Sequence, residues 1–84
     1  MVNHPRRSKG VRIALARQKV VRLRNLAAWQ RGEYAGAYRR QASHPIYAGQ
    51  DIVCENRAAQ AERLANANDA QADVLSAKIA AGEI

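Results

Sequence analysis

The stretch DIVCENRAAQAERLANANDAQADVLSAKIAA, residues 51–81, decides the fold that we predict for this chain of 84 residues. On a helical wheel its apolar residues fall within an arc of about 120°. They are Val53, Cys54, Ala61, Leu64, Ala65, Ala72, Leu75 and Ile79. The acids Glu55, Glu62, Asp69 and Asp73 gather on the other side of the wheel. The stretch is therefore predicted to be an amphipathic helix, with Asp51 as its N-cap and Gly82 just beyond its end.

An unbroken helix over residues 51–81 would be about 46 Å long, which exceeds the width of a globule of this size. Part of such a helix needs a second chain to cover it. The alternative is a break at Asn66-Ala67-Asn68-Asp69, because Asn and Asp have poor helix propensity. The sequence leaves both outcomes open.

Two shorter helices are expected before the long one. The first covers about residues 9–31, with Ser8 as N-cap and Gly32 after its end, and it is rich in Ala, Arg, Leu and Gln. The second covers about residues 33–43 and ends before Pro45, because the residue that precedes a proline is disfavoured in the helical region.

The predicted organisation is a basic arm over residues 1–10 and a single small helical domain over residues 11–84. Its fold class is mostly α, with the helices packed as a helical hairpin or a small bundle. Val, Ile and Leu are scarce and Phe is absent, so the core is expected to be marginal and oligomerisation is a reasonable expectation.

A short strand over residues 11–15 is the alternative, because Val11, Ile13 and Leu15 alternate with other residues. With Val20, Leu23, Leu26 and Ala27 on one helical face after it, this segment resembles the strand and first helix of ribbon-helix-helix DNA-binding proteins. The resemblance implies a dimer whose paired strands enter the major groove, with Arg12 and Ala14 facing DNA.

Charge is distributed unevenly along the chain. The whole sequence carries 14 Lys and Arg against 7 Asp and Glu, a formal net charge of +7. Residues 1–47 hold eleven of the cations and one acid, Glu33, whereas residues 48–84 hold three cations and six acids. Clustered Arg and Lys attract phosphate backbones through Coulomb energy and counterion release, so a nucleic acid or another polyanion is the expected partner.

Spacing divides the cations into two sets. Arg17, Arg24 and Arg31 recur every seven residues, and so do Glu55, Glu62 and Asp69, so two antiparallel helices could pair these rows. The remaining cations of residues 1–47 are the candidate nucleic-acid-binding residues, together with Tyr38. This set comprises Arg6, Arg7, Lys9, Arg12, Lys19, Arg22, Arg39, Arg40 and Tyr38.

The four aromatic residues, Trp29, Tyr34, Tyr38 and Tyr47, lie within nineteen residues and are interleaved with arginines. Aromatic rings beside guanidinium groups can stack on unpaired bases. The competing interpretation is that the rings fill the corner between short helices, which is favoured for Trp29, whereas the two interpretations are balanced for Tyr38.

The sequence carries no pattern typical of an enzyme, a metal site or a cofactor site. His4, His44 and Cys54 lack the paired spacing of a zinc site, and the glycines stand singly. A single Cys and the absence of a long apolar run favour a cytoplasmic location, with no membrane span.

The leading hypothesis is a small non-enzymatic protein that binds nucleic acid mainly through phosphate contacts, while its last helix supplies packing or oligomerisation. The alternative is an assembly or inhibitor protein, such as a component of a virion or nucleoprotein particle or an accessory factor, that docks on an acidic protein surface. The predicted interface residues are Val53, Leu64, Leu75 and Ile79.

Overall fold

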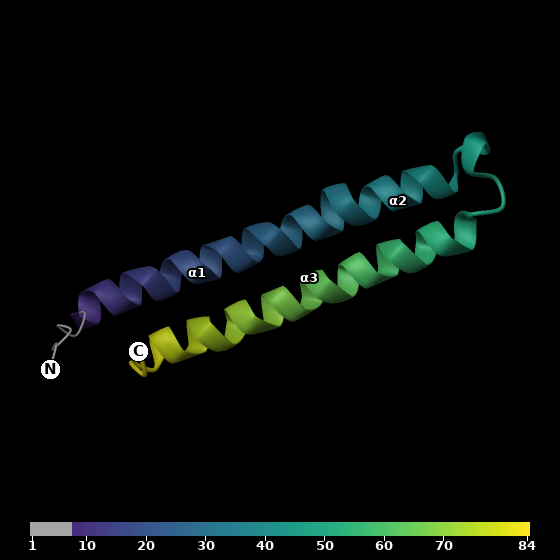
Figure 1. Cartoon of the computed structure of the whole chain (residues 1–84). Coiled ribbons are helices and arrows are strands. Elements are labelled where there is room, and N and C mark those ends of the chain that lie inside the picture. Colours follow the sequence, from purple (N-terminus) through teal and green to yellow (C-terminus); the bar gives the residue numbers. More distant parts are fainter. Residues whose placement is uncertain (1–7) are drawn as a thin grey trace, which may run out of the picture.

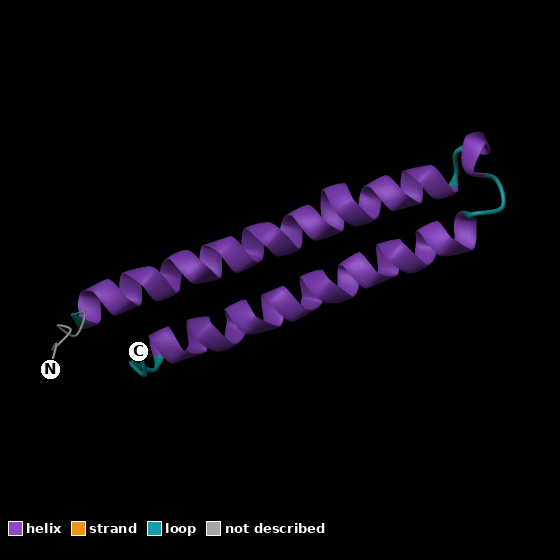
Figure 2. Cartoon of the chain, viewed as in Figure 1, coloured by secondary structure: helices purple, strands orange, loops and turns teal. Residues whose placement is uncertain are grey.

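The computed structural model describes residues 8–84, which form two long antiparallel helical arms joined by a short connection (Figure 1). The elements are helix α1 (Lys9–Trp29), the π-helical turn η1 (Gln30–Tyr34), helix α2 (Ala35–Ala42), the 3₁₀ turn η2 (Pro45–Tyr47) and helix α3 (Asp51–Ala80). Within the described residues there is no strand (Figure 2). The predicted helical hairpin is confirmed.

Helix α1 begins at the residue predicted to cap it. The side-chain oxygen of Ser8 accepts a hydrogen bond from the backbone N–H of Val11 at 3.2 Å, which satisfies one of the free donors of the first turn. The helix therefore begins inside the segment assigned to the basic arm, and residues 1–7 of that arm lie outside the described residues. Because residues 11–15 belong to α1, the strand alternative and the ribbon-helix-helix arrangement are wrong.

The chain does not leave the helical path at Gly32, where the first helix was predicted to end. Residues Gln30–Tyr34 form a π-helical turn that connects α1 directly to α2. In residues 8–84 only Gly49 and Gly82 have a positive φ, so Gly32 does not adopt the left-handed conformation of a C-terminal cap. Helices α1 and α2 thus form one arm of the hairpin (Figure 1).

The reversal between the arms is built from His44 to Gln50. The backbone N–H of Ile46 donates to Nδ1 of His44 at 3.2 Å, and Pro45 begins the 3₁₀ turn with its fixed φ. Gly49 then takes φ 88°, a left-handed conformation that a residue with a Cβ rarely adopts. The predicted end of the second helix before Pro45 is confirmed.

Helix α3 is unbroken over thirty residues, so it is about 45 Å long. Gln50 is its N-cap and makes no side-chain cap hydrogen bond; Asp51, the predicted cap, is instead the first helical residue. At the other end Gly82 has φ 74°, and the N–H groups of Gly82 and Glu83 donate to the carbonyls of Ile79 and Lys78. This is the closure predicted for the C-terminus.

Small residues form the seam between the two arms. Every buried side chain in residues 8–84 belongs to an alanine or to Cys54. On α3 these residues are Cys54, Ala58, Ala61, Ala65 and Ala72, whose spacings fit the alternating three and four of a coiled coil. The α1–α2 arm contributes Ala27 and Ala35, and Tyr38 packs against the same cluster. Alanine lets the helices approach closely but buries little apolar area.

The π turn keeps this seam continuous. Ile13, Ala16, Val20, Leu23, Ala27 and Gln30 follow the three-and-four spacing along α1 and into the turn. The next residue of an uninterrupted series would be Tyr34, but the residue buried against α3 is Ala35. The wider turn absorbs one residue and returns the seam to Ala35, Tyr38 and Ala42.

Candidate nucleic-acid interface

The hairpin measures 62 × 30 × 15 Å, so it is one helix thick and has two broad faces. Ion pairs gather on one of them. Nη2 of Arg24 donates to Asp73 at 2.9 Å, and Arg24 also pairs with Asp69 at 3.7 Å. Farther along the same row, Arg31 binds Asp69 and Arg39 binds Glu62. We call the surface formed by Arg24, Arg31, Arg39, Glu62, Asp69 and Asp73 the ion-pair face.

The predicted pairing of charged rows is found for Arg24 and Arg31 only. No ion pair in residues 8–84 includes Arg17 or Glu55. Arg17 instead shares a groove with Ser76 and Ile79 near the end of α3, where the helix offers no acid.

Arg39 occupies the place in this row that an uninterrupted heptad would give to residue 38. The π turn adds one residue after Arg31, so the next member of the row is eight residues away. Arg39 was predicted to bind nucleic acid, but its guanidinium is engaged by Glu62. We therefore remove Arg39 from the candidate set.

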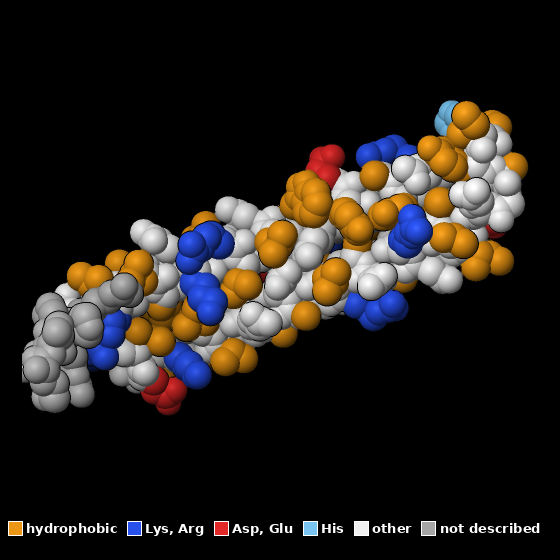
Figure 3. Space-filling view, in the orientation of Figure 1, with side chains coloured by type: hydrophobic (Ala, Val, Ile, Leu, Met, Phe, Trp, Pro, Cys, Tyr) orange, Lys and Arg blue, Asp and Glu red, His pale blue; other side chains and the backbone are white. Residues whose placement is uncertain are grey.

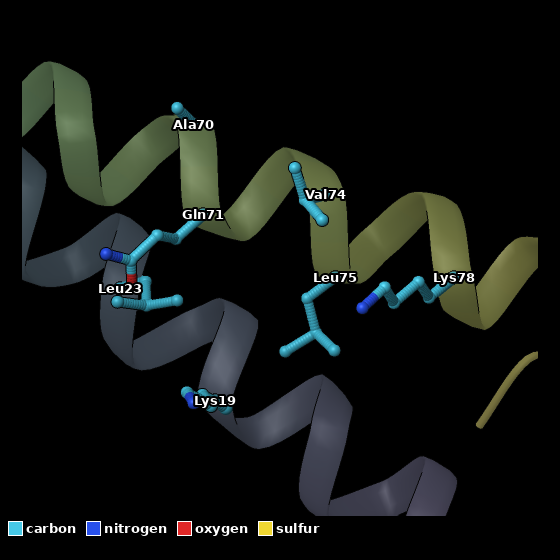
Figure 4. Close-up of a pocket in the computed structure, with 7 residues that line it drawn as sticks. All are labelled: Lys19, Leu23, Ala70, Gln71, Val74, Leu75 and Lys78. Atoms are coloured by element: carbon cyan, nitrogen blue, oxygen red, sulfur yellow. The ribbon is translucent and has the colours of Figure 1, made fainter.

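A second set of cations lies on the opposite face, close to the chain ends. Lys19 of α1 and Lys78 of α3 line one groove between the helices, whose apolar lining includes Leu23, Val74 and Leu75 (Figure 4). Arg12 lies seven residues before Lys19, which is two helical turns, and therefore projects to the same side of α1.

Arg22 lies three residues beyond Lys19 and extends this cationic surface. We call the surface formed by Arg12, Lys19, Arg22 and Lys78 the basic face. The face drawn in Figure 3 shows Lys and Arg near the chain ends and also in the half toward the reversal, hydrophobic side chains along its middle, and acids near its edges.

The acids of α3 do not reach the basic face, for a reason visible in their spacing. Glu55, Glu62 and Asp69 are seven residues apart and Asp73 follows four residues later, so all four project to one side of the helix. That side is the ion-pair face, because Glu62, Asp69 and Asp73 make their contacts there. The two broad faces of the hairpin therefore carry different electrostatic character.

An aromatic row continues the basic face toward the middle of the molecule. The ring centroids of Trp29 and Tyr34 are 5.6 Å apart, and those of Tyr34 and Tyr38 are 5.2 Å apart. The guanidinium of Arg57 on α3 lies over the Tyr38 ring, 5.6 Å from its centroid. Trp29 follows Arg22 by seven residues, so both project to the same side of α1.

The members of this row differ in exposure. Tyr38 packs against the buried alanines, which assigns it a packing role. Trp29 is 51% exposed and Tyr34 is 40% exposed, so the interpretation of Trp29 as a core residue is wrong. The neighbouring Tyr38 hydroxyl raises the pKa of Tyr34 above its usual 10.0, mainly through a hydrogen bond between the phenols, and Arg57 acts in the other direction.

The other predicted site residues are dispersed. Lys9 is exposed in the first turn of α1, and Arg40 lines a shallow pocket with His44 and Tyr47 near the reversal. Arg6 and Arg7 lie outside the described residues.

The four predicted interface residues divide into two pairs. Val53 and Leu64 are about half exposed, whereas Leu75 and Ile79 lie partly buried where α3 faces α1. Leu75 and Ile79 are therefore already used within the hairpin, and only the first pair is free to contact another molecule.

Sequence reasoning missed two cations, Lys78 and Arg57. Both belong to residues 48–84, whose net charge is negative, whereas the predicted nucleic-acid-binding residues were all taken from the basic residues 1–47. An antiparallel hairpin that aligns Arg24 with Asp73 also brings Lys78 beside Lys19, and this alignment was the signal that could have found it.

Metal ligands do not cluster within residues 8–84, where no group of three His, Cys, Asp or Glu side chains could hold an ion. Cys54 is buried. Within the same residues no helix combines the length and the apolar character needed to cross a membrane. Comparisons with protein-family models, curated proteins and solved structures found no match.

Proposed function

We propose that this chain is a non-enzymatic nucleic-acid-binding protein whose basic face contacts phosphates. The observation that carries the proposal is the separation of charge between the two faces. Arg24, Arg31 and Arg39 are held by the acids of α3, while the basic face has cations from both helices and no acid of α3 among them. The phosphates of a polyanion that approaches this face therefore meet cations from both helices.

Phosphate contacts from the basic face have a measurable signature. Each phosphate neutralised on duplex DNA lowers the slope of log affinity against log salt concentration by about 0.9. Four contacts from Arg12, Lys19, Arg22 and Lys78 therefore predict a slope of roughly −3 to −4, and contacts from the N-terminal arm would steepen it. Such contacts read the backbone, so weak sequence preference is expected.

The test compares two triple variants of equal net charge. Arg12→Gln, Lys19→Gln and Arg22→Gln together remove most of the basic face. The control, Arg17→Gln, Arg40→Gln and Arg63→Gln, removes three exposed cations outside that face that make no ion pair within residues 8–84. Arg40 was predicted to bind nucleic acid, but it lies near the reversal with His44 and Tyr47 and is not part of the proposed contact surface. Anisotropy of a labelled 20-base-pair duplex is measured in 50–200 mM salt for both variants.

Loss of three phosphate contacts lowers the affinity on the order of 10²-fold near 0.1 M salt and flattens the salt slope by about 3. The control variant keeps most of both quantities. Equal losses in the two variants would show that only net charge matters and would contradict the proposal.

A docking protein for an acidic protein surface is the second candidate, favoured by the half-exposed Val53 and Leu64. In that case Leu64→Asp abolishes the complex, while the basic-face variant slows association and leaves most of the affinity. The nucleic-acid proposal predicts the opposite order. Leu75→Asp is unsuitable for this test because Leu75 packs between the helices.

A further inference from the structure

The two exposed residues of the aromatic row, Trp29 and Tyr34, do not fill the seam between the helices. Trp29 is 51% exposed although it is the largest side chain in the sequence, and the seam beside it is filled by Ala27 and Ala35. Tyr34, 40% exposed, contacts Trp29 on one side and Tyr38 on the other. The large rings thus lie on the surface, and small residues fill the interior.

We propose that Trp29 and Tyr34 form a stacking platform for unpaired bases, so that the ligand of this protein is single-stranded nucleic acid. The inference rests on the proposed function, since the basic face supplies the phosphate contacts. Single-strand binding combines a cationic track for the backbone with aromatic rings for successive bases. Both features are present along one side of the hairpin.

The order of residues along α1 supports this division of roles. Arg12, Lys19 and Arg22 precede Trp29 on the same side of the helix, and the distance from Arg12 to Trp29 is about 26 Å along the axis. A strand lying along this side would pass the cations and then reach the rings. In a duplex the bases are stacked inside the helix, so the rings could not reach their faces and only the phosphate contacts would remain.

Charge argues against a second copy of this chain as the occupant of the face. A twofold contact through the basic face would bring Lys19, Lys78 and Arg22 of one copy toward a surface that carries no acid of α3. Like charges would then be desolvated together, which opposes association. A strand of nucleic acid supplies the opposite charge and flat apolar rings at once.

The only tryptophan of the chain is Trp29, which makes the proposal directly observable. The full-length protein is titrated with a labelled oligothymidine of 12 nucleotides and with a duplex of 12 base pairs at the same ionic strength. Anisotropy of the labelled strand reports binding, and emission of Trp29 reports stacking. The variants are Trp29→Leu, Tyr34→Leu and the conservative Tyr34→Phe, with Tyr47→Leu as a control on a partly exposed ring near the reversal.

We expect the oligothymidine to quench Trp29 emission and the duplex to leave it nearly unchanged. Trp29→Leu and Tyr34→Leu each weaken oligothymidine binding about 5- to 100-fold and leave duplex binding nearly intact. Tyr34→Phe and Tyr47→Leu keep the affinity of the unmodified protein. Circular dichroism confirms that each variant remains helical.

The outcomes separate the two proposals. The stacking platform is refuted, while phosphate binding stands, if both nucleic acids bind but Trp29 emission is unchanged at saturation. It is also refuted if Trp29→Leu and Tyr34→Leu weaken binding of the oligothymidine and of the duplex equally. If neither ligand binds at low salt, the proposed function itself fails. A shift of Trp29 emission with protein concentration alone, accompanied by a doubled mass in light scattering, would show a second copy on this face and overturn the inference.

Discussion

Deletion of Gly32 is the perturbation that tests the architecture most sharply. In the native chain Gln30 and Ala35 both belong to the seam but are five residues apart, because the π turn absorbs one residue. Without Gly32 the two are four residues apart, which is the spacing of an uninterrupted α-helix. The seam residues Ala35, Tyr38 and Ala42 therefore keep facing α3, and Arg39 keeps its partner Glu62.

The expected change in stability follows from the residue that is lost. Glycine inside a helix costs about 1 kcal/mol relative to alanine, and the π turn is replaced by regular helical hydrogen bonding. The deletion should raise the free energy of unfolding by about 1 kcal/mol, which corresponds to a rise in Tm of about 4–8 °C for a domain of this size. Thermal unfolding followed by circular dichroism at 222 nm measures it.

Deletion of Gln18 is the matched control, since it also shortens α1 by one residue. It rotates the preceding residues by about 100° and carries Ile13 and Ala16 away from the seam, so the protein should lose stability. If deletion of Gly32 destabilises the protein as much as deletion of Gln18, the π turn is not a one-residue insertion into a continuous seam, and the reasoning is refuted.

Three further predictions concern single side chains. Ala61→Leu should destabilise the hairpin by about 1–3 kcal/mol in urea unfolding, because Ala61 is fully buried against the other arm; an unchanged midpoint would contradict the buried seam. Asn68→Ala removes the 2.9 Å hydrogen bond from Nδ2 of Asn68 to Oε1 of Gln30 and should cost about 1 kcal/mol, with a native-like spectrum as the control for folding. Tyr38→Phe should lower the pKa of Tyr34 toward 10.0, because the phenol that raises it is gone; an unaltered tyrosine absorbance titration would exclude that cause.

The long helix and part of its charge pairing followed from the sequence because they depend on local rules. The period of apolar residues, the glycine at position 82 and the seven-residue recurrence of Arg24 and Arg31 are all contained in short stretches. Of the two outcomes that the sequence left open, the break at Asn66–Asp69 does not form, since these polar residues find partners across the hairpin: Asn66 and Asp69 bind Arg31, and Asn68 binds Gln30. Tertiary contacts thus override weak helix propensity.

The π turn and the true seam were beyond local rules. Glycine is the residue type typical of the position just after a helix, so the sequence predicted an end at Gly32. That the helical path continues is shown only by the packing of α3 against the helices on both sides of the turn. Val53 and Leu64 belong to the apolar arc of the wheel but are half exposed, because a single partner helix covers only a narrow strip. For the same reason the side chain of Trp29 lies outside the strip that the partner helix covers and stays exposed. The candidate site consists of residues that the partner helix leaves exposed, so it could be identified only from the structure.

The central claim is that the two faces of the hairpin differ in function, and arginine side-chain NMR tests it most directly. The Nε–Hε signals of the arginines are followed in the full-length protein during titration with the 12-nucleotide oligothymidine. We predict that the signals of Arg12 and Arg22 shift, while those of Arg24, Arg31 and Arg39 stay with their acids. Shifts of the ion-paired arginines, or equal shifts of all arginines, would contradict the account.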